Sequence, residues 1–348
     1  MKRVLLGMSG GVDSSAAVIL LQKQGYEVVG ITFKFIEDFD DTDAKKVAEK
    51  LNIEHHTVDY RKEFKKDVID RFLDDYSKGL TPNPCVICNR LCKFNFLFEN
   101  MEKYNCDFIA TGHYAKIENG KLYRSKDLMK DQSYFLYDLP KDKINKIIFP
   151  LDGLTKEEVR EIASEYKLEN AHKKDSFDVC FIKGTFNDYI KENSKQNSGD
   201  VINIDTNEVI GKHKGLMYYT IGQRRGLDIG GTEDRMFVVG KNIEKNILYV
   251  CIGDENNYLI SDSCLLENVN YLDDNKLNKC TAKFRYRQVD IPVELEYLED
   301  NKLLVKYPQG VKRVTPGQAC VLYNDNECLG GGIITEVRKD NEKLWYIN

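Results

Sequence analysis

Two periods of hydrophobic positions alternate along the first half of the chain. Short runs rich in Val, Ile, Leu and Phe, typical of strands, are separated by stretches in which apolar side chains recur every three or four positions, as in helices. Strands that alternate with helices pack as a parallel sheet covered on both faces, so this half predicts an α/β domain. The predicted strands are residues 3–8, 26–35, 54–60 and 107–114, and the predicted helices are residues 14–25, 43–52, 62–79 and 155–168.

The helical period ends near residue 190. Residues 191–200 are polar and rich in Ser and Asn, which predicts a domain linker. Strand-like runs within 215–254 predict a small β-rich middle domain, and those within 280–337 predict a terminal barrel or sandwich. With 348 residues, the chain is long enough for several hydrophobic cores. The predicted domains are residues 1–197, 198–262 and 263–348.

Composition narrows the class of protein. Hydrophobic residues make up 42% and charged residues 31% of the chain, as in soluble globular proteins, and the net charge of −5 argues weakly against polyanion binding by the whole surface. Polar residues interrupt the apolar N-terminal run from Ser9 to Asp13, so we expect no signal peptide, and no run reaches membrane-spanning length. We expect a cytoplasmic protein without membrane or DNA partners, whose ten cysteines are reduced and in which a close pair is catalytic or metal-binding.

A glycine-rich segment, Gly7 to Ser15, joins the first predicted strand to the first predicted helix. Glycines let backbone N–H groups turn towards a ligand, and the helix N-terminus and serine hydroxyls complete an anion cradle. Asp13 fits this cradle if Mg²⁺ bridges its carboxylate to phosphates. The segment has neither the Gly-Lys-Ser/Thr of a Walker loop nor the G-x-G-x-x-G of a dinucleotide fold. An ordinary strand-to-helix turn is the simpler alternative.

The S-G-G-V-D-S core of this segment resembles the pyrophosphatase loop (PP-loop) of the N-type ATP pyrophosphatases. With further motifs in residues 79–94, 110–116, 174–182 and 215–231, the chain is similar, almost from end to end, to the tRNA-specific 2-thiouridylase family. The resemblance implies an α/β PP-loop domain with a parallel sheet, a small β-rich middle domain and a C-terminal β-barrel. It also implies that ATP adenylylates the C2 oxygen of the wobble uridine of certain tRNAs. Sulfur from a cysteine persulfide, supplied by a sulfur-carrier protein, then replaces that oxygen, releasing AMP and pyrophosphate.

The resemblance also implies an ATP site on the glycine-rich segment. Gly112 would let the nucleotide approach the backbone, and the backbone of Phe33 would meet adenine. Asp13 remains the candidate ligand of Mg²⁺. The implied ATP-binding residues are Gly7, Met8, Ser9, Gly10, Gly11, Val12, Asp13, Ser14, Phe33 and Gly112.

Two cysteines match the sulfur chemistry of the family, Cys88 as the nucleophile and Cys180 as the bearer of the persulfide. Both lie in segments that we predict to be irregular, which could meet at the end of the parallel sheet. Lys93, Lys173 and Lys174 would favour thiolates there. Sulfur transfer would leave a disulfide between Cys88 and Cys180, which a reductant must reset. For either cysteine alone, burial in an apolar core is the simpler alternative.

Cys85 stands at a position where many members of the family carry an aspartate that is thought to act as an acid or base. A cysteine thiolate can replace that aspartate only as a proton acceptor. Cys85 forms C-x-x-C with Cys88, and with Cys180 it makes a set of three thiols that could hold a [4Fe-4S] cluster with one open iron. The resemblance favours the persulfide route over this cluster. A Cys₄ zinc site fits less well because a second C-x-x-C is lacking. Cys92 has no assigned role.

The resemblance also marks a tRNA surface. Basic residues interleaved with tyrosines within residues 208–226 suit phosphate pairing and base stacking. A strand over residues 283–287 would place Lys283, Arg285 and Arg287 on one face, for which a solvated charged edge is the alternative. The implied tRNA-binding residues are Asn83, Pro84, Cys85, His113, Lys130, Asp131, Gln132, Arg224, Arg225, Arg285, Tyr286 and Gln318.

Two other functions remain open. A PP-loop ligase that delivers ammonia or an amine to another substrate would need no paired thiols, so full activity without Cys88 would favour it. A non-catalytic tRNA-binding protein of the same fold would form no AMP from ATP, Mg²⁺ and unmodified tRNA.

Overall fold

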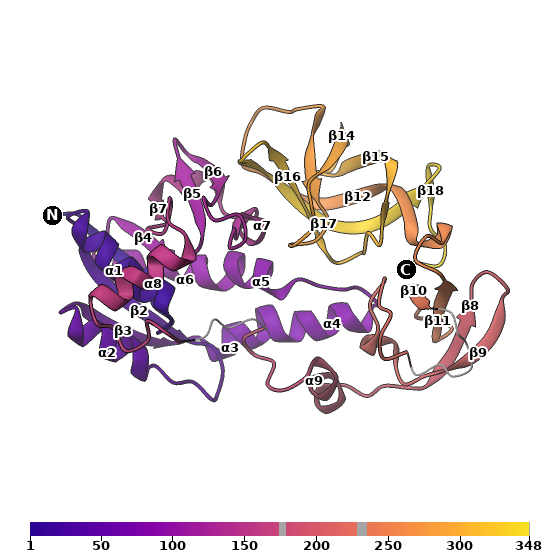
Figure 1. Ribbon diagram of the computed structural model, residues 1–348, viewed down its shortest axis with the longest axis horizontal. Helices are drawn as coiled ribbons and strands as arrows, with labels where there is room; N and C mark the ends of the chain where they lie inside the picture. The colour runs from indigo at the N-terminus through magenta and orange to yellow at the C-terminus, as the bar shows by residue number, and fades with distance from the viewer. Residues whose placement is uncertain (174–178, 228–234, 348) are drawn as a thin grey trace.

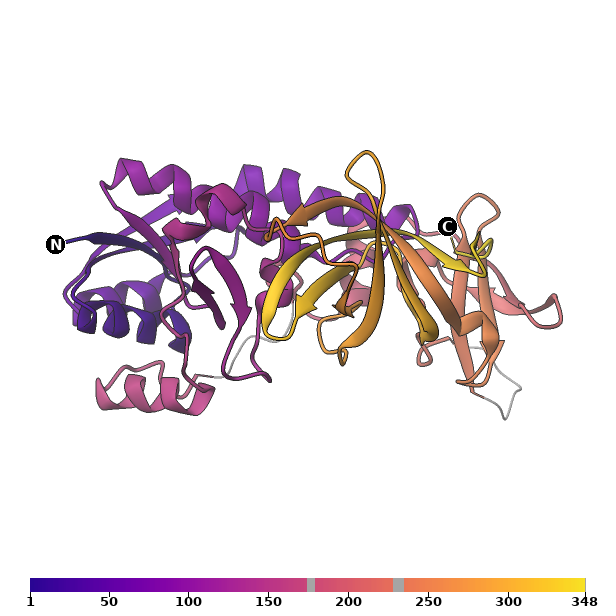
Figure 2. The ribbon, with the colours of Figure 1, turned by 90° about the horizontal axis from the view of Figure 1, so that it is seen from above.

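The computed structural model describes residues 1–173, 179–227 and 235–347. The N-terminal α/β part lies at one end of an elongated molecule, and strands β8 (Gly199–Asn203) to β11 (Ile247–Ile252) lie at the other (Figure 1). The C-terminal strands lie between these two parts, and the view turned by 90° shows the same order along the long axis (Figure 2).

A parallel sheet forms the centre of the N-terminal part. Its strands are β1 (Arg3–Gly7), β2 (Glu27–Lys34), β3 (Glu54–Asp59), β4 (Phe108–Thr111) and β7 (Ile147–Ile148). In the described residues their order is β3-β2-β1-β4-β7, with every pairing parallel.

Helices cover both faces of this sheet. They include α1 (Val12–Lys23), α2 (Thr42–Lys50), α6 (Asn95–Lys103) and α8 (Lys156–Glu165). Val4 and Leu6 of β1 belong to the cluster that includes α1 and α8, whereas Leu5 belongs to the cluster that includes α6. A strand buried on both faces is a continuous apolar run, which is why the sequence predicted it, and the α/β class is confirmed.

Two helical runs lie between β3 and β4, and each contains a π-helical stretch. The predicted helix over 62–79 consists of α3 (Arg61–Phe64), the π-helix η1 (Lys65–Asp70) and α4 (Arg71–Ser77). A second run consists of α5 (Pro84–Ile87) and the π-helix η2 (Cys88–Phe94) and continues into α6. Cys88 thus lies in a helix, and the prediction that its segment is irregular is wrong. Pro84 at the first helical turn explains the start, because its missing N–H is not needed there.

The start of α8 is a capping box, which the spacing of Thr155 and Glu158 in the sequence favours. The Glu158 N–H donates to Thr155 Oγ1 at 3.3 Å, and the Thr155 N–H donates to Glu158 Oε2 at 2.6 Å. Within the predicted linker over 191–200, α9 (Phe186–Asn193) covers the start and β8 the end, so regular secondary structure is lacking in residues 194–198. The Thr185 hydroxyl caps α9 at the Asp188 N–H, which supports a helix in a polar stretch.

The middle part contains a small mixed sheet, with both antiparallel and parallel strand pairs. Its described strands are β8, β9 (Glu208–His213), β10 (Met236–Asn242) and β11, in the order β10-β11-β8-β9. Residues 215–227, predicted as strand-like, instead form the 3₁₀ turn η4 (Leu216–Tyr218) followed by turns.

The C-terminal strands close into a barrel. They are β12 (Ile260–Tyr271), β13 (Lys279–Lys283), β14 (Ile291–Tyr297), β15 (Leu303–Lys312), β16 (Ala319–Asn324) and β17 (Glu327–Lys339). Because β12 pairs with both β15 and β17, the circle is complete and the barrel, not the sandwich, is correct. The predicted strand over 283–287 is wrong, since β13 ends at Lys283 and turns follow.

Several contacts connect the barrel to the α/β part, among them a strand pairing and a pair of hydrogen bonds at Thr81. The hairpin of β5 (Ala115–Glu118) and β6 (Lys121–Arg124) extends the barrel sheet because β6 pairs with β17. Nearer to α5, the Thr81 N–H donates to Pro316 O at 3.0 Å, and Gln318 Nε2 donates to Thr81 O at 2.7 Å. Gly317 lies between these bonds with φ of 88°, and a Cβ there would come within 2.8 Å of Thr81 N.

We expect Gly317→Ala to destabilise the protein by about 1–3 kcal/mol more than a matched glycine substitution, because its methyl group would collide with the Thr81 backbone. Gly153→Ala is the control, since Gly153 has φ of 80° and a Cβ there meets nothing within 4 Å. Chemical denaturation gives both free energies of unfolding. Equal losses would contradict a tight joint at Thr81.

Candidate active site

A cavity of about 620 Å³ opens at the carboxyl ends of β1, β2 and β4. Parts of α5, η2 and the segment around Cys180 complete its wall. Open parallel sheets bind ligands at this edge, because the loops that follow the strands meet there. The predicted residues in its lining are Gly7, Met8, Ser9, Asp13, Ser14, Phe33, Pro84, Cys85, Cys88, Gly112, His113, Gln132 and Cys180.

The remaining predicted residues do not line this cavity. Val12 is buried at the start of α1, and the others lie in the same loop, at the start of α5 or farther away. Those described residues are Gly10, Gly11, Val12, Asn83, Lys130, Asp131, Arg224, Arg225, Arg285, Tyr286 and Gln318.

A network of hydroxyl groups fixes the loop before α1. Ser14 Oγ donates to Gly11 O at 3.1 Å and accepts from the Ser9 N–H at 3.2 Å. Ser15 Oγ donates to Gly11 O at 2.9 Å, and Asn170 Nδ2 donates to Ser15 Oγ at 2.8 Å. The loop therefore has a defined shape at the N-terminus of a twelve-residue helix, which favours bound anions.

Asp13 shares its carboxylate with a buried lysine. Lys156 Nζ lies 2.7 and 2.9 Å from the two carboxylate oxygens, and Tyr114 Oη donates to one of them at 2.8 Å. Mg²⁺ is commonly held by one or two carboxylates together with substrate phosphates, and Asp13 at the cavity wall fits that arrangement. In the described ranges, no group of three His, Cys, Asp or Glu side chains could hold a metal ion by itself.

Gly112 joins the loop to the end of β4. A Cβ on Gly112 would lie 2.9 Å from both Asp13 C and Ser14 N. The resemblance assigns Gly112 to the approach of a nucleotide, and the structure shows in addition that Gly112 makes room for the backbone of the loop itself. The glycine thereby brings the loop and β4 into the same cavity wall.

The three candidate thiols share the cavity wall but differ in exposure. Cys88 is buried, whereas Cys85 and Cys180 are exposed. Desolvation raises the pKa of each thiol, that of Cys88 to about 12. The charge of Lys93 opposes this rise at all three thiols, and the charge of a Cys180 thiolate adds to it at the other two. All three thiols line the same cavity.

Lys93 favours the thiolate form of all three thiols, as the sequence predicted, but the pKa of each thiol is nevertheless raised. Burial outweighs the Lys93 charge at each thiol. Lys173 is engaged elsewhere, with Nζ 2.6 Å from Asp43 Oδ2. Lys174 lies outside the described residues.

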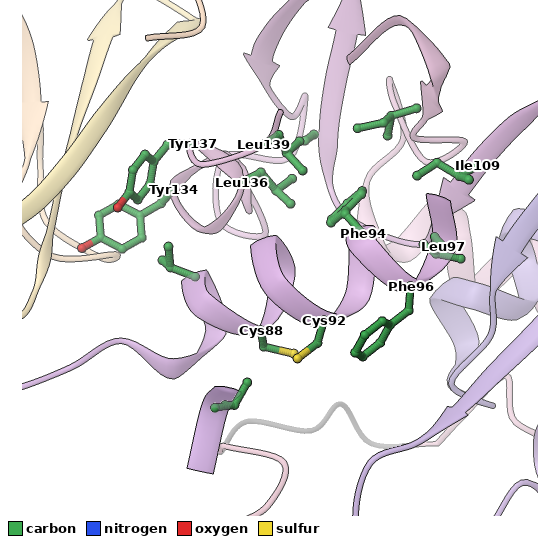
Figure 3. Packing of buried hydrophobic residues seen from close by; sticks show 14 of the residues in the cluster. Cys88, Cys92, Phe94, Phe96, Leu97, Ile109, Tyr134, Leu136, Tyr137 and Leu139 are labelled. Atoms are coloured by element: carbon green, nitrogen blue, oxygen red, sulfur yellow. The ribbon is translucent and has the colours of Figure 1, made fainter. Parts of the chain in front are cut away.

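Cys92 belongs to the hydrophobic core. It is fully buried and lies one turn after Cys88 (Figure 3). Phe94, Phe96 and Leu97 belong to the same cluster of buried side chains. Burial raises the Cys92 pKa, so the group stays a neutral thiol. All ten cysteines lie in the described ranges and are free thiols.

His113 is a buried, neutral side chain at the cavity wall. Its Nδ1 lies 2.7 Å from Thr111 Oγ1, and its Nε2 lies 3.5 Å from Lys93 Nζ. Burial, with a contribution from the Lys93 charge, holds its pKa well below the usual value. A cationic role for His113 is therefore disfavoured.

Several residues expected to contact tRNA are engaged within the protein. Asp131 accepts from the Ser125 N–H at 3.0 Å, so its carboxylate shapes the turn before α7 (Ser133–Leu136). Gln132 Oε1 accepts from the Tyr114 N–H at 3.0 Å. Asp131 and Gln132 therefore help to position the cavity wall, whether or not they also contact tRNA in a complex.

Arg285 and its neighbour also differ from expectation. The Arg285 guanidinium donates to Ile221 O, Arg313 O and Thr315 Oγ1 at 2.8–3.0 Å, so it does not lie on an exposed charged face. The Tyr286 ring packs against Phe135, with 4.3 Å between ring centroids. Arg224 and Arg225 are exposed, as a tRNA contact requires.

The cavity wall also contains residues that the sequence did not predict. Asn89 is adjacent to Cys88, and Asp38 and Asp40 follow β2. Adjacency to a predicted nucleophile or to the end of a predicted strand could have marked all three as candidate site residues. Phe135 is brought in by the tertiary fold, with no signal in its own segment.

No helix in the described ranges is long and apolar enough to span a membrane.

Three family models match consecutive parts of the chain. They are described as a tRNA methyl transferase HUP domain over residues 2–184, a tRNA methyl transferase PRC-barrel domain over residues 187–252 and an aminomethyltransferase beta-barrel domain over residues 261–334. Their order agrees with the α/β, middle and barrel parts seen in the structure.

Full-length relatives are similar over nearly the whole chain. A tRNA-specific 2-thiouridylase MnmA of Metamycoplasma arthritidis is 45% identical, covering 99% of this chain and 100% of that protein. Proteins of the same name from Geobacillus thermodenitrificans and Bacillus subtilis are 44% and 43% identical, each covering 99% of this chain and 98% of theirs.

We expect Lys93→Met to slow alkylation of Cys85 and Cys180 severalfold at fixed neutral pH. The Lys93 charge lowers the pKa of these thiols, so its loss raises their pKa and decreases the thiolate fraction. The pH profile of iodoacetamide labelling, followed by peptide mass spectrometry, should move to higher pH. Lys173→Met is the control and should leave the profile in place; an unmoved profile in Lys93→Met would contradict the assignment.

Proposed function

The chain belongs to the tRNA-specific 2-thiouridylase family, and we propose that Cys88 and Cys180 carry out the sulfur transfer of that family in the cavity described above. It is an ATP-dependent tRNA-uridine 2-sulfurtransferase that uses ATP with Mg²⁺ and acts on tRNA. The observation that carries the proposal is the convergence of the glycine-rich loop and of thiols about ninety positions apart on one cavity.

The loop at α1 supports the activation step. The β- and γ-phosphates of ATP would lie on the loop of Ser9 and Ser14, with Asp13 directed to Mg²⁺. Phe33 and Gly112 line the same cavity, as an ATP site there requires. The uridine O2 attacks the α-phosphorus and pyrophosphate leaves, which converts a poor leaving group at C2 into a good one.

Sulfur transfer then needs two cysteines. The terminal sulfur of a Cys180 persulfide attacks C2, and the C2–O bond breaks so that the oxygen departs with AMP. The Cys88 sulfur attacks the inner sulfur of Cys180, which releases the thiocarbonyl of 2-thiouridine and forms a Cys88–Cys180 disulfide. The two thiols supply the two electrons, and a dithiol reductant resets them.

The difference in exposure supports this division of roles. Cys180 is exposed, so a persulfide carrier protein can reach it, whereas Cys88 is buried and protected from oxidation by solvent species. Cys88 must lose its proton during the reaction, and Cys85, which also lines the cavity, could accept it only in its thiolate form, which burial disfavours. We propose a cytoplasmic location, where thiols stay reduced.

The alternatives gain less support. A [4Fe-4S] cluster on Cys85, Cys88 and Cys180 would need three converging ligands, and among the described residues no three His, Cys, Asp or Glu side chains are placed to hold a metal ion. A PP-loop amide or amine ligase would leave the thiols without a purpose. The division into domains at residues 1–197, 198–262 and 263–348 stays part of the proposal.

We expect Cys88→Ala and Cys180→Ala each to abolish 2-thiouridine formation while ATP binding persists, because each removes one partner of the sulfur transfer. Nucleoside mass spectrometry of the tRNA measures the product, and equilibrium dialysis measures ATP. Cys280→Ala, which changes a thiol in the barrel, is the control and should keep activity. Normal product from either active-site variant would refute the proposed roles.

Cys85→Ser separates the persulfide route from the cluster. Under the persulfide route this variant keeps measurable activity, and anaerobically purified wild-type protein carries no stoichiometric iron and sulfide. Iron and sulfide that are bound in the wild type and lost together with activity in Cys85→Ser would establish the cluster instead.

The exposed pair Arg224 and Arg225 should contribute to tRNA binding through phosphates. We expect Arg224→Ala to weaken binding at low salt and to reduce the slope of log affinity against log salt by about one unit. Filter binding over a salt series measures both. Arg285→Ala is the contrast, since its guanidinium bonds within the protein and its loss should lower the free energy of unfolding. An unchanged slope in Arg224→Ala would exclude the phosphate contact.

A further inference from the structure

Asn89 is a buried polar residue beside the nucleophile. It follows Cys88 in η2, and only 4% of its side chain is exposed. Cys85, Asn89 and Lys93 are spaced four residues apart, and all three line the cavity. Residues four apart share a helix face, so the Asn89 side chain belongs to the face turned towards the cavity.

One hydrogen bond fixes the orientation of the Asn89 amide. Its Nδ2 donates to the main-chain oxygen of Phe135 at 3.0 Å. A carbonyl oxygen only accepts, so the reversed amide would set two oxygens against each other. Oδ1 is therefore the free end of this side chain, and it can act only as an acceptor.

Oδ1 of Asn89 has no hydrogen-bond partner in the protein. Buried polar atoms nearly always have one, so each exception requires an explanation. In the part of the chain that the structure describes, seven buried side-chain nitrogen or oxygen atoms are in this condition. Asn89 Oδ1 is the one that belongs to a residue lining the cavity; the oxygen itself is buried in this structure, so a donor on the ligand reaches it when the cavity wall around Asn89 moves.

The uracil ring offers a matching donor. Its N3–H is bonded directly to C2, the atom at which oxygen is replaced. Cytosine has a bare nitrogen at the same place, which accepts and does not donate. A carboxamide oxygen beside the nucleophile therefore attracts uracil, whereas cytosine would leave two acceptors facing each other and unpaired.

We propose that Asn89 Oδ1 accepts the hydrogen bond of the uracil N3–H, which places C2 beside Cys88 and selects uridine over cytidine. This inference rests on the proposed function. When O2 attacks the α-phosphorus and pyrophosphate leaves, the ring gains a positive charge while the proton stays on N3. Asn89 holds that proton in place, so C2 remains electron-poor until sulfur attacks. AMP leaves as an anion, and the ring becomes neutral when Cys88 attacks the inner sulfur of Cys180 and the released electron pair forms the thiocarbonyl.

The test compares two tRNAs that differ only in uridine or cytidine at the modified position. For the full-length protein with ATP and Mg²⁺, kcat/KM for AMP release is measured on each tRNA. We expect the wild type to prefer uridine strongly. We expect Asn89→Leu, and equally Asn89→Ala, to reduce the uridine-to-cytidine ratio of kcat/KM by about tenfold or more, because the oxygen that penalises cytosine is gone.

Asn100→Leu is the matched control. Asn100 is also buried, and its Nδ2 also donates to a main-chain oxygen, that of Phe96 at 2.8 Å, but it lies outside the cavity lining. Its loss should lower activity on both tRNAs alike and leave the ratio unchanged. An unchanged ratio in a folded Asn89→Leu or Asn89→Ala protein would overturn the inference. Failure of the wild type to form 2-thiouridine would instead overturn the proposed function.

Discussion

The helical run from Pro84 to Phe94 is held on two sides by hydrogen bonds, and the rest of the site depends on this constraint. On one side, Thr81 is bonded through both of its main-chain groups to the barrel, at Pro316 and Gln318. On the other, the Asn89 amide is bonded to Phe135. The run carries two of the three candidate thiols, so a shift of either anchor would move them away from the glycine-rich loop. The barrel is thus part of the active-site scaffold as well as a candidate tRNA surface.

Electrostatics in the cavity favour neutral thiols before substrate binds. Burial raises the pKa of Cys85, Cys88 and Cys180, and Lys93 only partly offsets it. A neutral thiol is a weak nucleophile, so unproductive oxidation is slowed while the site waits for substrate. The leaving-group chemistry of the adenylylated base supplies reactivity at C2, which lessens the need for a permanently ionised cysteine.

Polar residues that family resemblance assigns to tRNA often have a second task in the fold. Arg285 bonds to three oxygens of neighbouring segments, and Asp131 organises a turn at the cavity. The identity of a charged residue in the sequence does not tell whether its side chain faces solvent or donates hydrogen bonds to buried carbonyl groups. Only the three-dimensional structure distinguishes the two: Arg285 bonds within the protein, whereas Arg224 and Arg225 are exposed.

The sequence by itself determined the α/β class, the glycine-rich loop at the start of α1 and the capping box of α8, because these depend on neighbours in the chain. The cysteine pair came from resemblance to a family, since spacing alone could not bring residues 88 and 180 together. The tertiary structure decided the closed barrel, the helical setting of Cys88, the burial that opposes Lys93 and the free oxygen of Asn89. Each of these depends on segments far apart in sequence, whose packing sets desolvation and hydrogen bonding that no local pattern records.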